Sequence, residues 1–553
     1  MPKQHLLYFA LAGLTMGSAA TAGSISQADV TRYLEQSTWG PTSDAVTACQ
    51  KLGSIDKCLA AEFKIPATLY RVPAEMPPSS GLGCPKGSPA TCPRDHYSQY
   101  PNQVEFFKHA LTGHDQLRQR VAYALHQILV VSGVKIPQPG YYAPYLNVLL
   151  DDAFGNFRQL LENITLNPAM GHYLDMVNND KPSANGKTSP NENYAREVLQ
   201  LFSIGLNWLN DDGSILLDKQ NQPIPTYDQD SIEGFAHVFT GWTFANRNSS
   251  SASHFPNPVN YADPMALYRD SKGQDIHHDK SVKTLLSLTP GGMVTTLPAN
   301  QDAELDLKDA LDNIFNHPNV GPYIGKQLIQ HLVTSNPSPD YVSRVTQAFN
   351  TGKSHGFGSG KRGDMQAVIA AILLDPSARG SAPASANFGH LREPVQFVVN
   401  TLKTLNAHSD GFLNPYTHIM GQDLFYPATV FNYYPHQYQA PGTVLQGPEF
   451  GIDSSTNALA HENFVNELVF GKIQPDKTSS GSGFDLTPLS KLAVNPTELV
   501  AQLNRQFMHG AMSAYMQSEL LTAINHVPAK ETKLRAQTAL YLVLASGQYQ
   551  IQR

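Results

Sequence analysis

A chain of 553 residues, of which only 15% are charged, can form one very large domain or several ordinary ones. Its formal net charge of −7 argues against a nucleic-acid-binding protein, because such proteins present a basic surface to the phosphate backbone. The 39 prolines and 40 glycines fit a loop-rich exported protein.

The first 22 residues have the three parts of a secretory signal peptide. Lys3 gives a short positive region, residues 6–16 are mostly apolar, and Ala20-Thr21-Ala22 is a small-residue cleavage site. The apolar run is too short to span a bilayer, and no later run reaches spanning length. We therefore expect cleavage after Ala22 and a mature protein, not spanning a membrane, in the periplasm or the medium.

The four cysteines fall into two close pairs, Cys49 with Cys58 and Cys84 with Cys92. In an oxidising compartment two short local disulfides are expected, although four cysteines allow three connectivities. Neither pair has the C-x-x-C spacing of a zinc site. Residues 66–100 are dense in Pro, Gly and Ser, which predicts an irregular surface loop held by the second pair.

Apolar residues recur at helical spacing through most of the mature chain, which predicts a mainly α fold with long irregular loops. We divide the chain into residues 23–100, a helical segment with the stapled loop, and residues 101–553, a large multi-helix domain continuous with it. One strong helical pattern runs from Gln103 to Gly133 and contains His126 on its apolar face. Further helical patterns cover residues 27–64, 145–163, 168–177, 305–332, 341–349, 365–374, 394–405, 455–470, 496–507, 519–524 and 530–545.

The segment 189–205 concentrates polar groups at the start of an apolar helix. Ser189 and Glu192 have the spacing of a capping box. Arg196 and Glu197 then lie beside an apolar face, where charges are costly unless they are paired. This carboxylate and guanidinium are therefore either part of a site or a buried structural pair.

Two features follow this helix along the chain. Residues 207–217, with an Asp-Asp-Gly turn, predict a small β-hairpin insertion. Asp230 is then expected to cap a helix that ends near Gly241-Trp242.

Polar and aromatic stretches provide the remaining candidates. His278 and Asp279 are adjacent in a polar region, where they suit metal ligands, an acid–base pair or simply an exposed loop. Residues 425–438 are rich in Tyr, Phe and Pro, which fits either a binding platform or a packed irregular loop. Metalloprotease, serine-hydrolase, haem-attachment and dinucleotide signatures are absent. A catalytic site must therefore come from dispersed residues.

Several stretches resemble, in the same order, the bacterial family DUF1800. The most specific of them in this chain is the run Asn191 to Glu197, Asn-Glu-Asn-Tyr-Ala-Arg-Glu. The other matching stretches are Trp39 to Thr42, Leu117 to Arg120 with His126, Asn167 to Met170 with Tyr173 to Asp175, Phe239 to Trp242, His278-Asp279 with Lys283, His317-Pro318 with Lys326, and Gly421-Gln422 with Pro427. The resemblance implies a large, mostly helical exported protein without an established reaction. Members are often encoded beside a DUF1501 protein, which resembles phosphatases and sulfatases.

The chain departs from the commonest family pattern at two places. Many members have Glu and His where this chain has Gln200 and Phe202, and a Trp-His-x-His run where it has residues 125–128, Leu-His-Gln-Ile. Two potential ligands or proton carriers are missing, so a bound divalent metal stays an open question.

Two hypotheses follow. The first is an extracytoplasmic hydrolase or transferase that acts on an envelope or extracellular polymer or ester, with or without a divalent metal. Its expected catalytic residues are Glu197, Arg196, His278 and Asp279, and its expected substrate-binding residues are Asn191, Asn193, His126 and Trp242. The second is a non-catalytic binding or assembly protein that works with a DUF1501-type partner or with a polymer.

Overall fold

The computed structural model describes residues 25–73, 84–379 and 387–553. In these ranges the chain is mainly α-helical, which confirms the predicted fold class, and its strands form small two-stranded antiparallel sheets. No helix in them is long and apolar enough to cross a membrane. The expected signal peptide lies outside the described residues.

The helices and strands fall into three parts along the chain. The N-terminal part forms α1 (Gln27–Ser37), α2 (Ser43–Leu52), α3 (Ile55–Glu62) and α4 (Cys92–His96). The next part forms α5 (Tyr100–Thr112), α6 (Gln116–Ile128), α7 (Pro139–Asp152), α8 (Phe157–Thr165), α9 (Pro168–Tyr173), α10 (Asn193–Gln200), α11 (Gln229–Val238), β1 (Trp242–Thr243), β2 (Ala266–Leu267), β3 (Lys283–Ser287), β4 (Val294–Leu297), α12 (Ala303–Asn316), α13 (Val320–Leu332), α14 (Pro339–Thr351) and α15 (Met365–Leu373). The last part forms β5 (His390–Leu391), α16 (Pro394–Thr404), β6 (His408–Ser409), α17 (Asn414–Ile419), the 3₁₀ helix η1 (Pro448–Gly451), α18 (Ser455–Phe470), β7 (Ser482–Gly483), α19 (Thr487–Leu492), α20 (Pro496–Phe507), α21 (Ala514–His526), α22 (Thr532–Leu544), α23 (Gly547–Gln550) and β8 (Ile551–Gln552).

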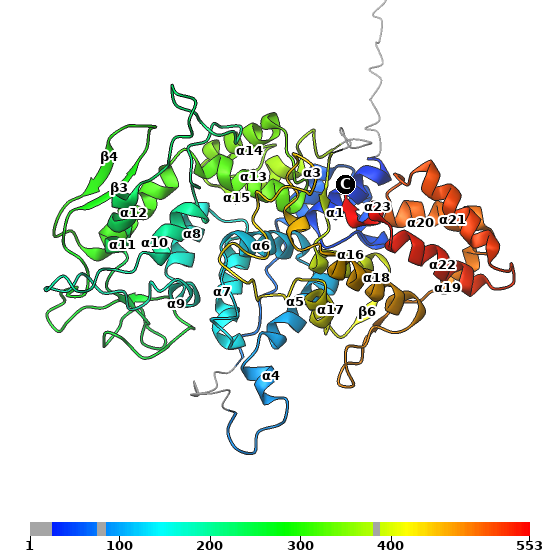
Figure 1. The fold of residues 1–553 in the computed structure, drawn as a ribbon, viewed down its shortest axis with the longest axis horizontal. Coiled ribbons are helices and arrows are strands. Elements are labelled where there is room, and N and C mark those ends of the chain that lie inside the picture. The colour runs from blue at the N-terminus through cyan, green and yellow to red at the C-terminus, as the bar shows by residue number, and fades with distance from the viewer. Residues whose placement is uncertain (1–24, 74–83, 380–386) are drawn as a thin grey trace, which may run out of the picture.

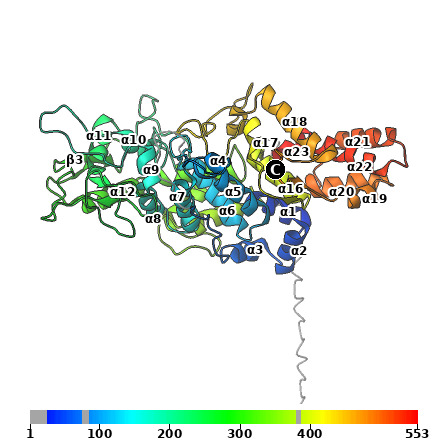
Figure 2. The same ribbon diagram turned by 90° about the horizontal axis from the view of Figure 1, so that it is seen from below.

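The molecule is elongated (Figures 1 and 2). One end contains α11, α12 and the β3–β4 hairpin, the middle contains α5 to α7 and α13 to α15, and the other end is the helical group α19 to α22. The short helix α4 projects from the middle part (Figure 1). One hydrophobic cluster nevertheless contains residues from Val30 of α1 to Tyr549 of α23.

Two predicted helix boundaries were wrong for local reasons. The single helical run from Gln103 is two helices, because the chain leaves α5 at Gly113 in extended conformation. The Gln116 side chain then donates to the carbonyl oxygens of His109 and Gly113, at 3.0 and 2.8 Å, and so satisfies groups at the helix end. The cap of α11 is Asp228, which accepts from the Ser231 amide, instead of the predicted Asp230.

The predicted β-hairpin is present after α10. Antiparallel bridges pair Leu209 with Ile215 and Leu217 with Pro223. The Asn319 side chain, at the start of α13, accepts from the Leu209 amide at 3.0 Å and donates to the Asn207 carbonyl at 2.8 Å. These bonds fix the hairpin against α13. The β3–β4 hairpin, which packs on α11, was not predicted.

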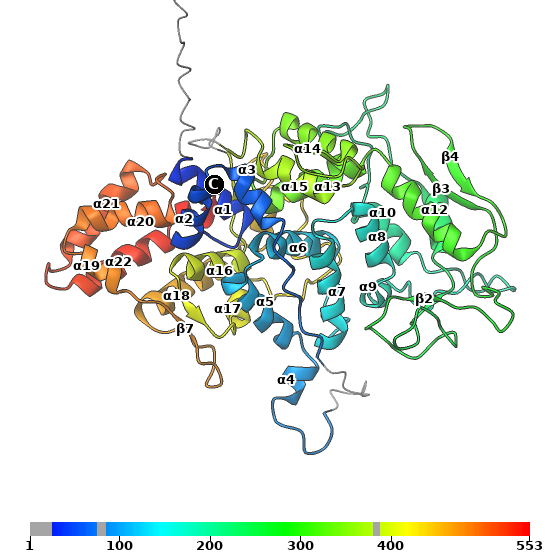
Figure 3. The ribbon, with the colours of Figure 1, turned by 180° about the vertical axis from the view of Figure 1, so that it is seen from behind.

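Helix α1 meets the C-terminal segment of the chain in the middle of the molecule. Glu35 of α1 pairs with Arg392 at 3.1 Å, and both side chains are 2% exposed. Arg392 also donates to the Tyr549 carbonyl of α23, and β5 pairs with the C-terminal β8. Figure 3 shows α1 to α3 beside α16 and the C-terminus. A buried charged cluster therefore joins segments more than 300 residues apart.

The predicted disulfides Cys49–Cys58 and Cys84–Cys92 are both present. Replacing Cys49 and Cys58 by Ala is expected to lower the free energy of unfolding by about 2–3 kcal/mol, because a cross-link across nine residues removes about that much chain entropy from the unfolded state. Both of these sulfurs belong to the core. The Cys84–Cys92 bond holds a projecting loop, so its removal should cost less. Thermal unfolding of the two double variants measures both losses of stability. Equal losses would contradict the prediction that the Cys49–Cys58 bond contributes more.

Candidate functional site

A cleft of about 500 Å³ lies where α6, α10, α13, the 206–215 hairpin and residues 430–449 meet. It is more enclosed than two other hollows of the surface. Helix α13 forms one wall, because Tyr323, Lys326, Gln327 and Gln330 recur at spacings of three and four and so share a face. The walls are rich in amide and aromatic side chains, which suit hydrogen bonding to a polar ligand.

Next to the cleft, the buried carboxylate of Glu393 accepts hydrogen bonds from uncharged side chains. Glu393 accepts from Gln127 at 2.9 and 3.0 Å, from Gln422 at 2.5 Å and from the Tyr434 hydroxyl at 2.7 Å. Gln127 and Tyr434 line the cleft. Because all these donors are engaged, the network fixes these side chains and leaves Glu393 little capacity for a ligand.

Glu449 is the carboxyl side chain among the described residues that line the cleft. It lies in η1, is 4% exposed, and one of its oxygens, Oε1, is 3.2 Å from Nδ1 of His390. Its other oxygen, Oε2, is buried and has no hydrogen-bond partner. A buried acceptor without a partner is costly, so a hydrogen-bond donor that reached Oε2 would be bound favourably.

Two residues of the lining, Gln330 and Asn432, also have a buried amide oxygen without a hydrogen-bond partner. The Gln330 side chain, 2% exposed, donates through Nε2 to the backbone carbonyls of Ser335 and His436, at 3.1 and 3.3 Å. Carbonyl oxygens only accept, so this nitrogen cannot be exchanged with Oε1, and Oε1 is left without a partner. Oδ1 of Asn432, whose residue is 7% exposed, is also unpartnered.

Lys326 is the lysine among the described residues that line the cleft. Burial lowers the pKa of Lys326 below its ordinary value, and no carboxylate in the described residues offsets this effect. The pKa of His331 is lowered to about 3, mainly by burial and also by Arg120. Burial, with a contribution from Lys326, lowers the pKa of His436 to about 4. Both imidazoles are therefore neutral at pH 7.

Helix α10 does not begin as predicted. It starts at Asn193, and Ser189 and Glu192 form no capping box. The Asn191 side chain accepts from the Asn193 amide at 2.9 Å instead. Arg196 pairs with Glu192 at 2.9 Å, one turn earlier, and both groups are partly exposed.

Glu197 is half-buried and its Oε2 is buried without a partner. Burial raises the pKa of its carboxyl group, and nearby Arg196 offsets part of the rise. Gln200 and Leu201, three and four residues later, line the cleft, so Glu197 lies one turn away on the same helix face. No hydrogen bond or ion pair in the described residues joins it to His278 or Asp279.

His278 and Asp279 belong to a buried network. His278 and Lys283 both contact Oδ2 of Asp306 at 2.8 Å, and all three side chains are fully buried. Lys283 also donates to the Asp279 carbonyl at 2.8 Å. The Asp279 carboxylate lies 3.2 Å from His237. These contacts link β3, α12 and α11 and leave His278 out of solvent reach.

The other expected substrate-binding residues are dispersed. His126 and Trp242 lie in the hydrophobic core, 2% and 5% exposed. Asn193 donates to Asp175 at 2.9 Å at the surface. Asn191 lines an open polar hollow of about 640 Å³ beside the 175–191 loop. The sequence candidates thus do not form one site.

His126 offers a direct test of its core position. Burial lowers its pKa to about 3, whereas an unfolded histidine has an ordinary value of 6.5. Protonation below pH 6.5 therefore favours the unfolded state, and stability falls with falling pH by about 1.4 kcal/mol per unit for this group. His126→Gln keeps a partner for the Tyr142 hydroxyl but does not titrate. Unfolding measured from pH 7 to 4 should show a shallower slope in this variant; equal slopes would contradict a neutral core position.

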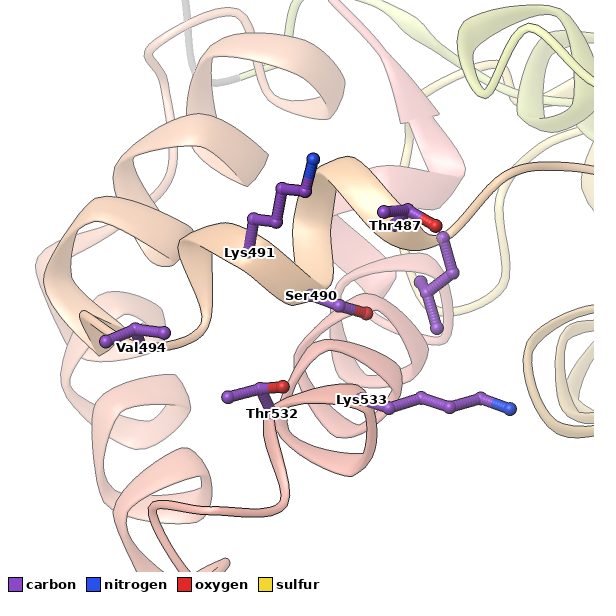
Figure 4. A pocket seen from close by; sticks show the side chains of 7 residues that line it. Thr487, Ser490, Lys491, Val494, Thr532 and Lys533 are labelled. Atoms are coloured by element: carbon purple, nitrogen blue, oxygen red, sulfur yellow. The ribbon is translucent and has the colours of Figure 1, made fainter.

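A further hollow, of about 560 Å³, lies between α19 and α22 (Figure 4). Lys491 and Lys533 extend from it in different directions, and Val494 is exposed at its edge. It lacks the buried unpartnered groups of the central cleft.

The model of the family described as "Protein of unknown function (DUF1800)" matches residues 32–551. The chain belongs to the DUF1800 family. No curated protein and no solved structure matches it. Ile128 and Gln200, two of the positions that depart from the pattern expected from the family resemblance, line the cleft, whereas Leu125 and Phe202 lie in the core. Lys326, which agrees with the pattern, lines it too.

Several residues that line the cleft of this DUF1800 protein could not be found from the sequence. Glu449 and Gln330 carry no recognisable motif. Asn432 and His436 lie in the aromatic stretch 425–438, for which a binding platform was one of two expectations, and Lys326 had a signal through the family resemblance. Among the described residues, no group of three or more His, Cys, Asp or Glu side chains is placed to hold a metal ion.

Proposed function

We propose that this DUF1800 protein is an extracytoplasmic hydrolase or transferase that acts in the central cleft on an ester of an envelope or extracellular polymer. The observation that carries the proposal is the position of Glu449, which lines the cleft; its Oε1 lies 3.2 Å from His390, and its Oε2 is buried without a hydrogen-bond partner. A positioned carboxylate of this kind is suited to general-base catalysis.

The arrangement favours an ester over a glycosidic bond. Cleavage of a glycosidic bond commonly uses two carboxyl groups that face each other across the sugar. Glu449 is alone among the described lining residues, and Glu393 is engaged by three donors. Ester hydrolysis or transfer needs one base to activate the attacking oxygen.

In this mechanism Glu449 Oε2 takes a proton from water or from an acceptor hydroxyl. The oxygen of that water or hydroxyl group attacks the carbonyl carbon of the ester. The carbon–oxygen bond to the leaving alcohol then breaks, and the leaving alkoxide receives the proton from Glu449. Amide groups of the walls are the donors available to the developing oxyanion. Glu197, one turn from the cleft, stays the second candidate for the general base, as in the sequence hypothesis.

The alternative is a non-catalytic binding or assembly protein that works with a DUF1501-type partner. It is supported by the burial of His278, Trp242 and His126, which places three expected site residues in structural contacts.

One assay separates the two functions. The mature protein is incubated with a panel of acylated polysaccharides and cell-wall polymers, with and without EDTA, and released acid or transferred acyl group is measured. Release or transfer supports the enzyme, and its loss in EDTA would show metal assistance. Binding of a polymer without any turnover across the panel would favour the binding protein.

A further inference from the structure

Acceptor oxygens without a partner in the lining residues favour a ligand that donates hydrogen bonds. Glu449, Gln330 and Asn432 line the cleft, and each has a buried side-chain oxygen without a partner, which gains when a donor reaches it. Donors of a ligand are hydroxyl, amide or ammonium groups. An ammonium is disfavoured, because Lys326 already places a positive charge in the same cleft.

Lys326 favours an anionic group on the same ligand. It is partly buried, and no carboxylate in the described residues pairs with it. A cation in this position attracts an anion more strongly than one in open water does, because the partly excluded solvent screens it less. His331 and His436 do not compete for an anion, since both are neutral at pH 7.

The mouth of the cleft is apolar. Leu206, Ile215 and Phe431 line it and are 56%, 47% and 49% exposed. Exposed aromatic and aliphatic side chains beside polar groups suit a ligand that has both hydroxyls and C–H faces. Sugar rings combine these two kinds of surface.

We propose that the ligand of this cleft is an acidic saccharide, whose hydroxyls donate to Glu449, Gln330 and Asn432 and whose anionic group pairs with Lys326. This inference rests on the proposed function for the cleft itself and adds the substrate class. The shared chemistry is a polyhydroxylated anion, and a carboxylate, a sulfate or a phosphate can supply the charge.

The test is calorimetric titration of the full mature protein with short oligosaccharides. Uronate oligomers are compared with their methyl esters, which keep the hydroxyls and remove the charge, and sulfated and phosphorylated oligomers form two further arms. We expect at least one charged oligomer to bind about tenfold or more tightly than its neutral counterpart, with the difference shrinking as salt is raised.

Variants assign the effect to the cleft. Lys326→Met should remove the preference for charge while weak binding to hydroxyls stays, and Gln330→Leu should weaken the charged and neutral ligands alike. Lys308→Met, at an exposed position on α12, is the matched control and should bind as wild type does. Circular dichroism confirms that each variant is folded.

The outcomes separate this inference from the proposed function. Equal affinity for charged and neutral oligomers, or a preference that survives Lys326→Met, would overturn the acidic-saccharide assignment even where ester turnover is observed. Charge-selective binding without turnover would support the assignment and contradict the hydrolase or transferase.

Discussion

Glu449→Gln is expected to lower kcat on an ester substrate of the cleft by about 10²- to 10⁴-fold, the usual contribution of a positioned general base. Glutamine keeps the shape and the contact with His390 but cannot take a proton. KM should change far less, because the amide NH2 group that replaces Oε2 can still donate to a hydroxyl oxygen of the ligand. Steady-state kinetics of the variant beside wild type measures both parameters.

The control for Glu449 is Glu498→Gln, on the exposed face of α20, which should keep wild-type kinetics. A Glu449→Gln variant with wild-type kcat and KM would remove Glu449 from the mechanism.

Glu35→Gln is expected to lower the free energy of unfolding by about 3–5 kcal/mol, because it leaves Arg392 buried without its carboxylate. Glu35 also accepts from Asn400 at 2.9 Å and contacts His509 at 3.1 Å, so the change loosens α1, α16 and the segment before α21 together. Urea unfolding at pH 7 measures the loss.

The control for Glu35 is Glu192→Gln, which breaks the partly exposed pair with Arg196 and should cost less than about 1 kcal/mol. Similar losses at the two positions would contradict a structural role for the buried cluster.

The cost at Glu35 should also depend on pH. Burial alone would raise the pKa of Glu35, but Arg392, His509 and Asn400 outweigh it and lower the value to about 2, from an ordinary 4.5. The stabilisation is therefore fully present above pH 4.5 and disappears as the pH falls towards 2. A loss in Glu35→Gln that is the same at pH 7 and pH 3 would contradict this assignment.

The helical architecture was predictable because burial leaves a periodic record in the sequence. Leu117, Val121 and Leu125 are fully buried on one face of α6, as their spacing indicates. The disulfides were predictable from the short separations of their cysteines. Helix ends were less predictable. At the start of α10 the Asn193 amide donates to the Asn191 side chain, and the capping box expected from Ser189 and Glu192 does not form.

The site was harder to predict, because its residues come from segments far apart in the chain. A spacing rule cannot bring Gln127, Lys326 and Glu449 together; only the packing of α6, α13 and η1 does so. Nor can adjacency distinguish an acid–base pair from a structural cluster. His278 and Asp279 suit either. The contacts that decide it are with Asp306, on a later helix, and through it with Lys283.

The most direct test of the cleft as the binding site is a crystal structure of the protein with the oligosaccharide that binds most tightly. We predict the ligand in the cleft, with hydroxyl groups within hydrogen-bond distance of Glu449 Oε2 and Gln330 Oε1 and an anionic group beside Lys326. A ligand seated in the open hollow of the 175–191 loop, with the cleft unchanged, would contradict this prediction.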